Sequence, residues 1–205
     1  MTVKVRRGDL TDADLAALMA RPKVAWDIET TGLDPRTERI GTCQIAAPTI
    51  GVVVVQMDGT VPDRLRELLG SADTTKVFHH APFDLRFMAH SWKVQPTNVA
   101  CTKIASKLLN RDAPKQQHTL QYLLKQVVGV EISKAQRLSD WTAPELSDEQ
   151  LAYAAGDVQY LLKLYDELCR EMHRIGLIQL YRQCVEFLPT RVELDLGGWP
   201  DIYAY

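Results

Sequence analysis

The chain has 205 residues, of which 46% are hydrophobic and 24% are charged, and its formal net charge is −2 at neutral pH. With only 11 glycines and 10 prolines, these proportions exclude a disordered, collagenous or low-complexity chain. The nearly balanced charge argues against a protein that coats long nucleic acid through bulk electrostatics.

The first part of the chain predicts a helix followed by an antiparallel meander. Thr11 is a typical N-cap, and the helix that it opens carries Leu15, Leu18 and Met19 as apolar residues. Three β-rich runs follow in quick succession, separated by turn residues. They cover residues 23–30, 39–46 and 51–57.

The second part alternates helices and strands and then becomes helical. We expect a helix over 62–69, opened by its proline, a strand over 76–79, a helix over 83–91 and a short strand over 98–101. Further helices are predicted over 102–110, 118–128, 147 to about 175, and 177–188. Strands first and alternation afterwards predict an α/β fold in one domain spanning 1–205, a mixed β-sheet flanked by helices.

Two carboxylates interrupt the first apolar strand. Asp27 and Glu29 lie two residues apart, so the period of a strand places both on one face. Burying such a pair is costly unless something compensates the charge, and a divalent cation is the obvious compensator. The alternative is a strand end that runs out into solvent.

Three more residues extend this constellation. Asp84 begins a helix after the fourth strand, where an acid is often only a cap or a partner of the helix dipole. Tyr153 and Asp157 lie four residues apart and therefore share one helix face. The small residues around them allow that face to approach the sheet closely. Core packing explains the alanines equally well, but it does not explain an acid among them.

The charged residues are unevenly distributed along the chain. Residues 103–137 carry seven basic and two acidic side chains, whereas residues 139–167 carry seven acidic side chains and one basic one. Solvated helix faces account for this pattern, and so does a basic wall beside an acidic, cation-binding pocket. The low net charge is compatible with an enzyme that grips one or two nucleotides, because such an enzyme needs only a local basic patch.

The order D-x-E-x-T, then F-D after a strand, then Y-x-x-x-D on a late helix resembles the DEDD exonuclease superfamily, and the tyrosine marks its DEDDy branch, which includes RNase D. The segments KVFHHAPFDL, SKAQRLSDW and LSDEQLAYAAGDVQYL resemble RNase D as well. The segment CTKIASKL and the pattern FLP-x-R-x-x-LDL-x-GW, which runs from Phe187 to Trp199, resemble the short NrnC-type nanoRNase, an oligoribonuclease. The resemblance implies a ribonuclease H-like (DnaQ-like exonuclease) fold.

The resemblance also implies a reaction: metal-dependent 3'–5' hydrolysis of short RNA, with dinucleotides as the expected substrates and nucleoside 5'-monophosphates as products. Two divalent ions, Mg²⁺ or Mn²⁺, would be the cofactors, because hard cations prefer oxygen ligands. Asp27 would bridge both ions, Glu29 and Asp157 would bind the ion that activates water, and Asp84 would serve the second ion. Tyr153 would hydrogen-bond the attacking water or the scissile phosphate, as an orienting group rather than a ready base.

Other residues are weaker candidates for substrate binding. Backbone amides near Gly32 could approach the terminal nucleotide, although a plain turn explains that segment equally well. The two histidines that precede Asp84 could meet a phosphate, but lone histidines near a strand end are more often structural. Trp26 and Trp92 lie in apolar runs and are expected in the core. The substrate-binding candidates are Thr30, Thr31, Gly32, His79, His80, Lys134, Gln136 and Trp141.

The C-terminal segment, residues 177–205, is rich in apolar and aromatic residues for a terminus. We expect a helix and a tail that fold back onto the body or are buried against a neighbouring subunit. NrnC-type enzymes assemble as rings of eight, so the resemblance implies a homo-oligomer, an octamer. The chain ends without the helical HRDC domains that RNase D appends, which favours a very short single-stranded substrate.

Other functions remain open at this stage. The substrate could be DNA, because the metal chemistry does not depend on a 2'-hydroxyl, and an RNase D-like role in RNA processing is a further alternative. A catalytically inactive nucleic-acid-binding module would lack at least one acid, and here all four acids and the tyrosine are present in order.

The sequence also indicates where the protein resides. No apolar run approaches the ~20 residues of a membrane helix, and the charged N-terminus has no apolar core of the kind that a secretory signal needs. Cys43, Cys101, Cys169 and Cys184 lack CxxC spacing, so neither a disulfide scaffold nor a zinc site is expected. We therefore expect a cytoplasmic protein with no membrane partner.

Overall fold

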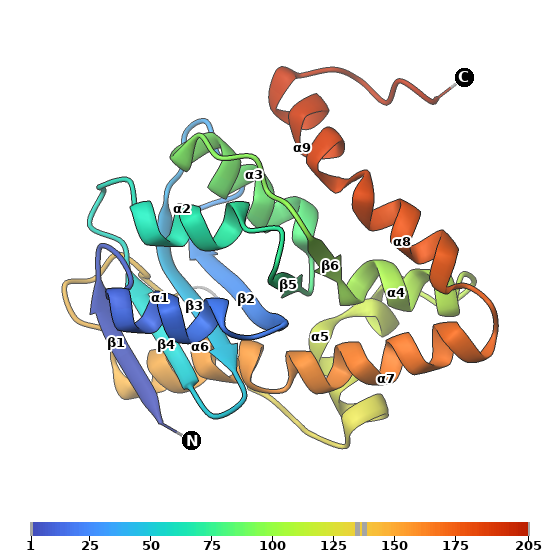
Figure 1. The fold of residues 1–205 in the computed structure, drawn as a ribbon, viewed down its shortest axis with the longest axis horizontal. Coiled ribbons are helices and arrows are strands. Elements are labelled where there is room, and N and C mark those ends of the chain that lie inside the picture. The colour runs from blue at the N-terminus through green and yellow to red at the C-terminus, as the bar shows by residue number, and fades with distance from the viewer. Residues whose placement is uncertain (1, 134–135, 137–138, 205) are drawn as a thin grey trace.

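The computed structural model describes residues 2–133, 136 and 139–204, and within them six strands form one mixed sheet (Figure 1). The strand order is β1-β4-β3-β2-β5-β6. The strands are β1 (Val3–Arg7), β2 (Lys23–Thr30), β3 (Ile40–Ala47), β4 (Gly51–Gln56), β5 (Thr75–Phe78) and β6 (Val99–Cys101). The predicted meander is confirmed, because β3 pairs antiparallel with both β2 and β4. β5 continues the sheet parallel to β2, and β6 is parallel to β5.

Strand β1 is absent from the sequence prediction. It pairs in parallel with β4 alone, at one edge of the sheet, and its residues are half-buried or exposed. An edge strand that buries little has a weak apolar alternation, so its position depends on a partner that is distant in the chain.

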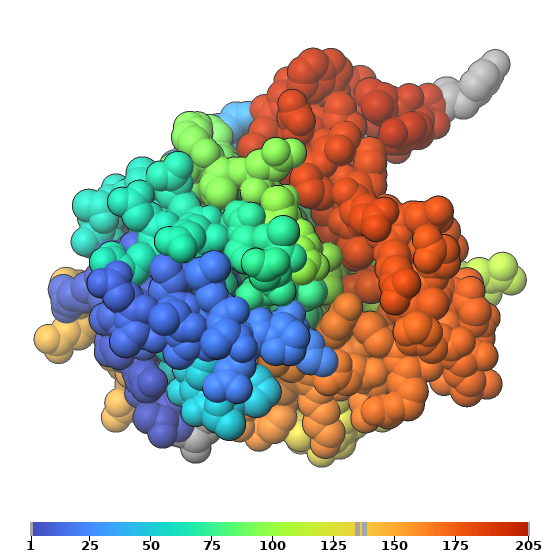
Figure 2. Space-filling view, viewed as in Figure 1, coloured from blue at the N-terminus to red at the C-terminus, as the bar shows by residue number. Residues whose placement is uncertain are grey.

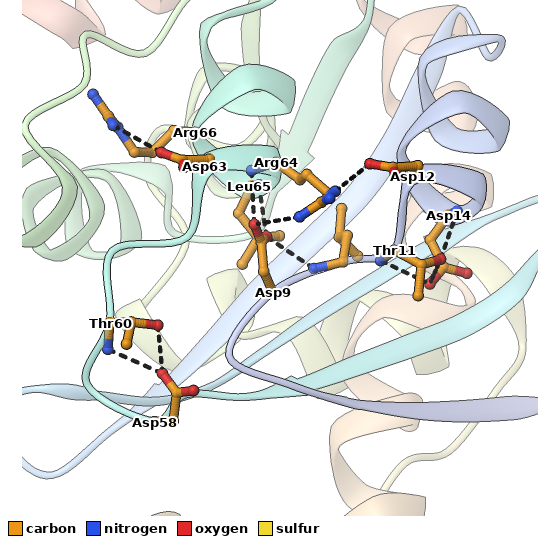
Figure 3. Close-up of polar contacts among 11 residues, drawn as sticks. Asp9, Thr11, Asp12, Asp14, Asp58, Thr60, Asp63, Arg64, Leu65 and Arg66 are labelled. Carbon is orange, nitrogen blue, oxygen red and sulfur yellow. Dashed lines mark hydrogen bonds and ion pairs between the residues drawn. The ribbon is translucent and has the colours of Figure 1, made fainter.

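The early helices follow the prediction closely. Helix α1 (Asp12–Met19) is opened by Thr11 in a capping box with Asp14. Helices α2 (Asp63–Gly70), α3 (Ala81–Trp92) and α4 (Thr102–Leu109) also lie where they were expected. Pro62 cannot cap α2 with its side chain. The Asp9 carboxylate instead accepts the N–H groups of Arg64 and Leu65 at 2.8 and 3.1 Å (Figure 3).

Two of the later helices differ from the prediction. Residues 118–128 are divided into α5 (Leu120–Leu123) and a π-helical turn, η2 (Leu124–Val128), after a 3₁₀ turn, η1 (Lys115–His118). The single helix expected over 147–175 is two helices, α6 (Asp148–Gln159) and α7 (Leu161–Arg174), which meet at Tyr160. No proline or glycine lies at that junction, so no local signal marks it.

The C-terminal segment forms two helices instead of one, α8 (Ile178–Glu186) and α9 (Leu188–Gly197). Pro189 lies in the first turn of α9, where proline starts a helix but cannot continue one. Helix α9 folds back and packs against α3, and its Leu188 and Val192 are buried in the core. The described residues after α9 project from the body of the molecule (Figure 2).

Two apolar layers enclose the sheet. One layer joins the sheet to α1, α2, α3 and α9, and it contains Trp26 and Trp92, as predicted. The other joins the sheet to α4, α6, α7 and α8. Successive residues of β2 alternate between them, with Trp26 and Ile28 in the first layer and Ala25 in the second. Asp27 and Glu29 lie two and four residues after Ala25 on the strand, so their side chains are on the same face of the sheet as Ala25, the face that α6 covers.

None of the helices in the described ranges combines the length and the apolar character that crossing a bilayer demands.

Candidate active site

The central feature of the site is a group of three carboxylates from two distant segments. One carboxylate oxygen from each of Asp27, Glu29 and Asp157 lies within 4.8 Å of the other two. Strand β2 supplies the first two acids and helix α6 supplies the third. The predicted convergence of residues more than 120 positions apart is therefore present. The donor set consists of oxygen alone, which fits hard divalent cations such as Mg²⁺ and Mn²⁺.

Helix α6 approaches the sheet closely because its inner face is small. It packs against β2, β3 and β4, and Ala154 and Ala155 are buried in the contact. Ser147 and Gln150 form a capping box at its start, and Gln150 also donates to the Asp140 carbonyl at 3.0 Å. The helix is thus fixed at the end that precedes Tyr153.

Asp84 lies beside this group rather than within it. Its side chain is 3% exposed, and its Oδ1 accepts the backbone N–H of Ile28 at 3.2 Å. Since Ile28 lies between Asp27 and Glu29, that bond places Asp84 directly next to the three carboxylates. Asp84 begins α3, as the sequence predicted, but it also reaches across to strand β2.

Burial and mutual repulsion raise the pKa of these acids. Burial raises the pKa of Asp27 to about 7, against hydrogen bonds from Gln44 and Ile28 that lower it. Burial and the nearby charge of Asp27 raise the pKa of Asp157 to about 8, and a hydrogen bond from Tyr153 opposes that shift. The same two causes, burial first, raise the pKa of Asp84 well above its usual range. A bound cation would offset the cost of holding these carboxylates ionised.

Trp141, which the sequence predicts to bind substrate, is buried, with its side chain 2% exposed. Its contact with substrate stays a prediction. The side chain packs against Tyr153, with ring centroids 5.8 Å apart. Gly41 of β3 permits this packing, because a Cβ there would lie 2.6 Å from the Trp141 carbonyl oxygen. The ring of Trp141 therefore packs against the ring of Tyr153 and supports its position.

The two histidines occupy different environments. His79 Nδ1 lies 2.9 Å from Thr102 Oγ1 and its Nε2 lies 3.1 Å from the His118 carbonyl oxygen, so both ring nitrogens are used inside the protein. Burial and the charge of Lys103 lower its pKa to about 3. The structural interpretation fits His79 better than contact with substrate. The side chain of His80 stacks on Phe83, but it is exposed to solvent and therefore accessible.

Residues 30–32 lie where β2 ends and the chain turns. Thr30 Oγ1 donates to the Gly32 carbonyl at 2.6 Å, and the Arg39 N–H donates to Thr31 Oγ1 at 3.0 Å. These bonds are those of a turn, the alternative that the sequence left open, and they lie at the end of the strand that carries Asp27 and Glu29.

A cavity of about 450 Å³ lies between α6 and the segment before it. Tyr153, Gly156, Ile132 and Gln136 are among its lining residues. Gln136 and Tyr153 therefore line the same cavity. Lys134, the other candidate from this segment, lies outside the described residues.

Sequence reasoning missed Gln44. This residue of β3 is opposite Asp27 in the antiparallel register, and its Nε2 donates to Asp27 Oδ2 at 2.7 Å. The available signal was an amide inside a strand that was expected to pair with the strand of Asp27, but only the register shows that the two side chains meet.

A mixed sheet flanked by helices, with two acids on strand β2 and one each on α3 and α6, matches a ribonuclease H-like fold of the DnaQ exonuclease type. The profile of a family described as 3'-5' exonuclease matches residues 5–173. The chain therefore belongs to the 3'–5' exonuclease family, as an enzyme of the RNase D and NrnC type.

Solved structures of similar proteins support this assignment. The chain is similar to Brucella melitensis NrnC with bound Mg²⁺, at 38% identity and a TM-score of 0.91, over 100% of both chains. It is also similar to Brucella melitensis NrnC bound to pGG, at 39% identity and a TM-score of 0.92, over 100% of this chain and 99% of that one. The predicted resemblance to this type is confirmed.

Among curated proteins, the chain is 31% identical to the ribonuclease D of Xanthomonas oryzae pv. oryzae over 198 residues. The match covers 95% of this chain but 52% of that protein, so the chain spans about half of the length of this relative.

Proposed function

We propose that this exonuclease hydrolyses short single-stranded RNA, down to dinucleotides, from the 3' end and releases nucleoside 5'-monophosphates. The observation that carries the proposal is the group formed by Asp27, Glu29 and Asp157, with Asp84 on the adjacent backbone amide. The short substrate is supported by similarity along the whole chain to an NrnC bound to pGG, which by its formula is a phosphorylated dinucleotide.

The residues of the site suit a reaction with two divalent ions. Such ions, when bound, activate water and neutralise charge on the leaving oxygen. Asp27, Glu29 and Asp157 would hold one ion, and Asp27 and Asp84 would hold the other. Tyr153, which is hydrogen-bonded to Asp157 and supported by Trp141, would orient the attacking water or the scissile phosphate. The oxygen-only donor set supports Mg²⁺ or Mn²⁺ as the ions.

We further propose that the protein is a single exonuclease domain that assembles as a homo-oligomer, an octamer. Trp199, Ile202 and Tyr203 are 58%, 52% and 72% exposed on the projecting C-terminal end (Figure 2), and large apolar side chains in such a position favour a subunit contact. Multi-angle light scattering of the purified chain tests this. A clean monomer would remove the proposal.

The activity is tested with 5'-labelled RNA of two to twenty nucleotides, incubated with Mg²⁺ or Mn²⁺ and resolved over time. We expect stepwise loss from the 3' end and faster cleavage of dinucleotides than of a long strand at equal concentration. The reverse ranking would favour an RNase D-like role in RNA processing. A matched DNA dinucleotide cleaved in preference to RNA would favour a DNA exonuclease.

The control for this assay is Asp27→Asn, which keeps the shape of the side chain but removes its charge. We expect no turnover from this variant. Turnover at the wild-type rate would overturn the two-ion assignment.

A further inference from the structure

Gln44 is buried in the sheet at the point where β3 faces the candidate metal site. Its side chain is fully buried, and so is that of Thr42, two residues earlier on the same face of β3. The Nε2 of Gln44 lies 2.7 Å from Asp27 Oδ2, and the Oε1 of Gln44 lies 3.2 Å from Thr42 Oγ1. The three side chains form a chain of hydrogen bonds that ends on Asp27.

The direction of each bond follows from the chemistry of the groups. An ionised carboxylate can only accept, so the amide NH₂ must be the end of Gln44 that faces Asp27. The amide oxygen then faces Thr42, whose hydroxyl donates to it. Thr42 therefore fixes which end of the Gln44 amide is presented to Asp27. A donor bonded to a charged acceptor forms one of the stronger hydrogen bonds in a protein.

A neutral donor suits this place better than a charged one. Lysine or arginine at position 44 would also hold the Asp27 carboxylate, but its charge would cancel that of the acid and compete with a cation. An amide restrains one carboxylate oxygen and leaves the charge and the other oxygen unchanged. Groups that orient a metal ligand in this way typically affect metal affinity by about 10–100-fold.

We infer that Gln44 is a positioning residue that sets the orientation of the Asp27 carboxylate for cation binding, and that Thr42 in turn orients Gln44. The inference rests on the proposed role of Asp27 as a metal ligand. Gln44 would touch neither the substrate nor the ions and would act through Asp27 alone.

The test is titration of the full-length, metal-free protein with Mn²⁺ in a calorimeter, without substrate. Gln44→Leu removes the donor, and we expect the Kd for Mn²⁺ to rise at least 10-fold. Thr42→Val keeps the shape and removes the orienting hydroxyl, so we expect a smaller rise of about 3-fold to 5-fold, a fraction of the full outer-shell effect. In turnover, both variants should lower kcat at limiting Mn²⁺ and leave the KM for RNA unchanged.

Thr74→Val is the matched control. Thr74 is fully buried and donates to the carbonyl oxygens of Met19 and Arg21, at the end of the sheet near α1. Its loss should lower the melting temperature as Thr42→Val does, but it should leave the Kd for Mn²⁺ within 2-fold of wild type. A purely structural role for Gln44 and Thr42 predicts that all three variants behave as this control does.

The outcomes separate the inference from the proposed function. Wild-type affinity for Mn²⁺ in Gln44→Leu would overturn the inference. If that variant does not fold, wild-type affinity in Thr42→Val would overturn it equally. A different result would contradict the proposed metal role of Asp27, namely an Asp27→Asn variant that binds Mn²⁺ with the same Kd as the wild-type protein.

Discussion

Removing one of the gathered charges should stabilise the metal-free protein and at the same time inactivate it. We consider Asp157→Asn, because Asp157 shares the carboxylate group with Asp27 and Glu29, and burial together with the charge of Asp27 raises its pKa to about 8. The substitution keeps the size of the side chain and can keep the hydrogen bond with Tyr153. What it removes is the repulsion between carboxylates.

The magnitude follows from the distance. Two unit charges at the 4.8 Å that bounds this group repel by about 3.5 kcal/mol at an effective dielectric constant of 20. The folded-state pKa of Asp157 lies above its unfolded value, so the stability associated with its proton is lost as pH rises through about 8. That loss begins at the unfolded pKa of about 4, so we expect Asp157→Asn to gain about 2–3 kcal/mol at pH 9, roughly half of that at pH 6 and almost none below pH 4.

Thermal unfolding in EDTA at pH 6 and pH 9 measures this difference. A gain of this size corresponds to roughly 5–10 °C in melting temperature for a chain of this length. Saturating Mn²⁺ should reverse the order at pH 9, because the cation stabilises the wild-type site far more than the variant. Glu193→Gln is the control, since it removes an exposed acid of α9 that has no ion pair among the described residues.

A variant that is no more stable than wild type at pH 9 in EDTA, and that responds equally to Mn²⁺, would refute the reasoning. It would mean that the three carboxylates carry no electrostatic cost for a cation to offset.

Three further predictions follow from the surroundings of the site. Tyr153→Phe should lower kcat by about 100-fold with no change in circular dichroism, because it removes the orienting hydroxyl; single-turnover kinetics at the wild-type rate would exclude Tyr153 from the reaction. Gly41→Ala places a Cβ 2.6 Å from the Trp141 carbonyl oxygen, so both melting temperature and kcat should fall, and a variant with both values intact would show that Trp141 does not support Tyr153. The pKa of His79 is about 3 in the folded protein and about 6.5 in the unfolded chain. As pH falls below about 6.5, the unfolded chain therefore binds a proton that the folded protein does not bind, and the protein loses stability. His79→Gln should make the fall in melting temperature between pH 6.5 and 4 shallower, and an unchanged slope would contradict that origin.

Local signals account for the parts of the fold that the sequence predicted. The capping residues of α1 and the strong β-forming runs of β2, β3 and β4 are readable from neighbouring residues alone. The missed features depend on distant partners. Strand β1 is specified by its pairing with β4, and the junction of α6 with α7 lies at Tyr160, where the chain carries no helix-breaking residue.

In the candidate site, too, some features follow from neighbouring residues and others depend on distant partners. Asp27 and Glu29 share a face because they lie two residues apart on a strand, and this is visible in the sequence. The match between Asp27 and Gln44 depends on the register of β2 against β3, which the sequence does not encode locally. The segment around Trp141 is visible as a motif in the sequence, but its burial against Tyr153 is a property of tertiary packing.

We propose that four carboxylates hold a pair of divalent cations. Anomalous scattering from Mn²⁺ in crystals of the full-length protein would locate such ions. We expect two peaks roughly 4 Å apart, one in contact with Asp27, Glu29 and Asp157 and the other with Asp27 and Asp84. Peaks that avoid these four side chains at saturating Mn²⁺ would contradict it.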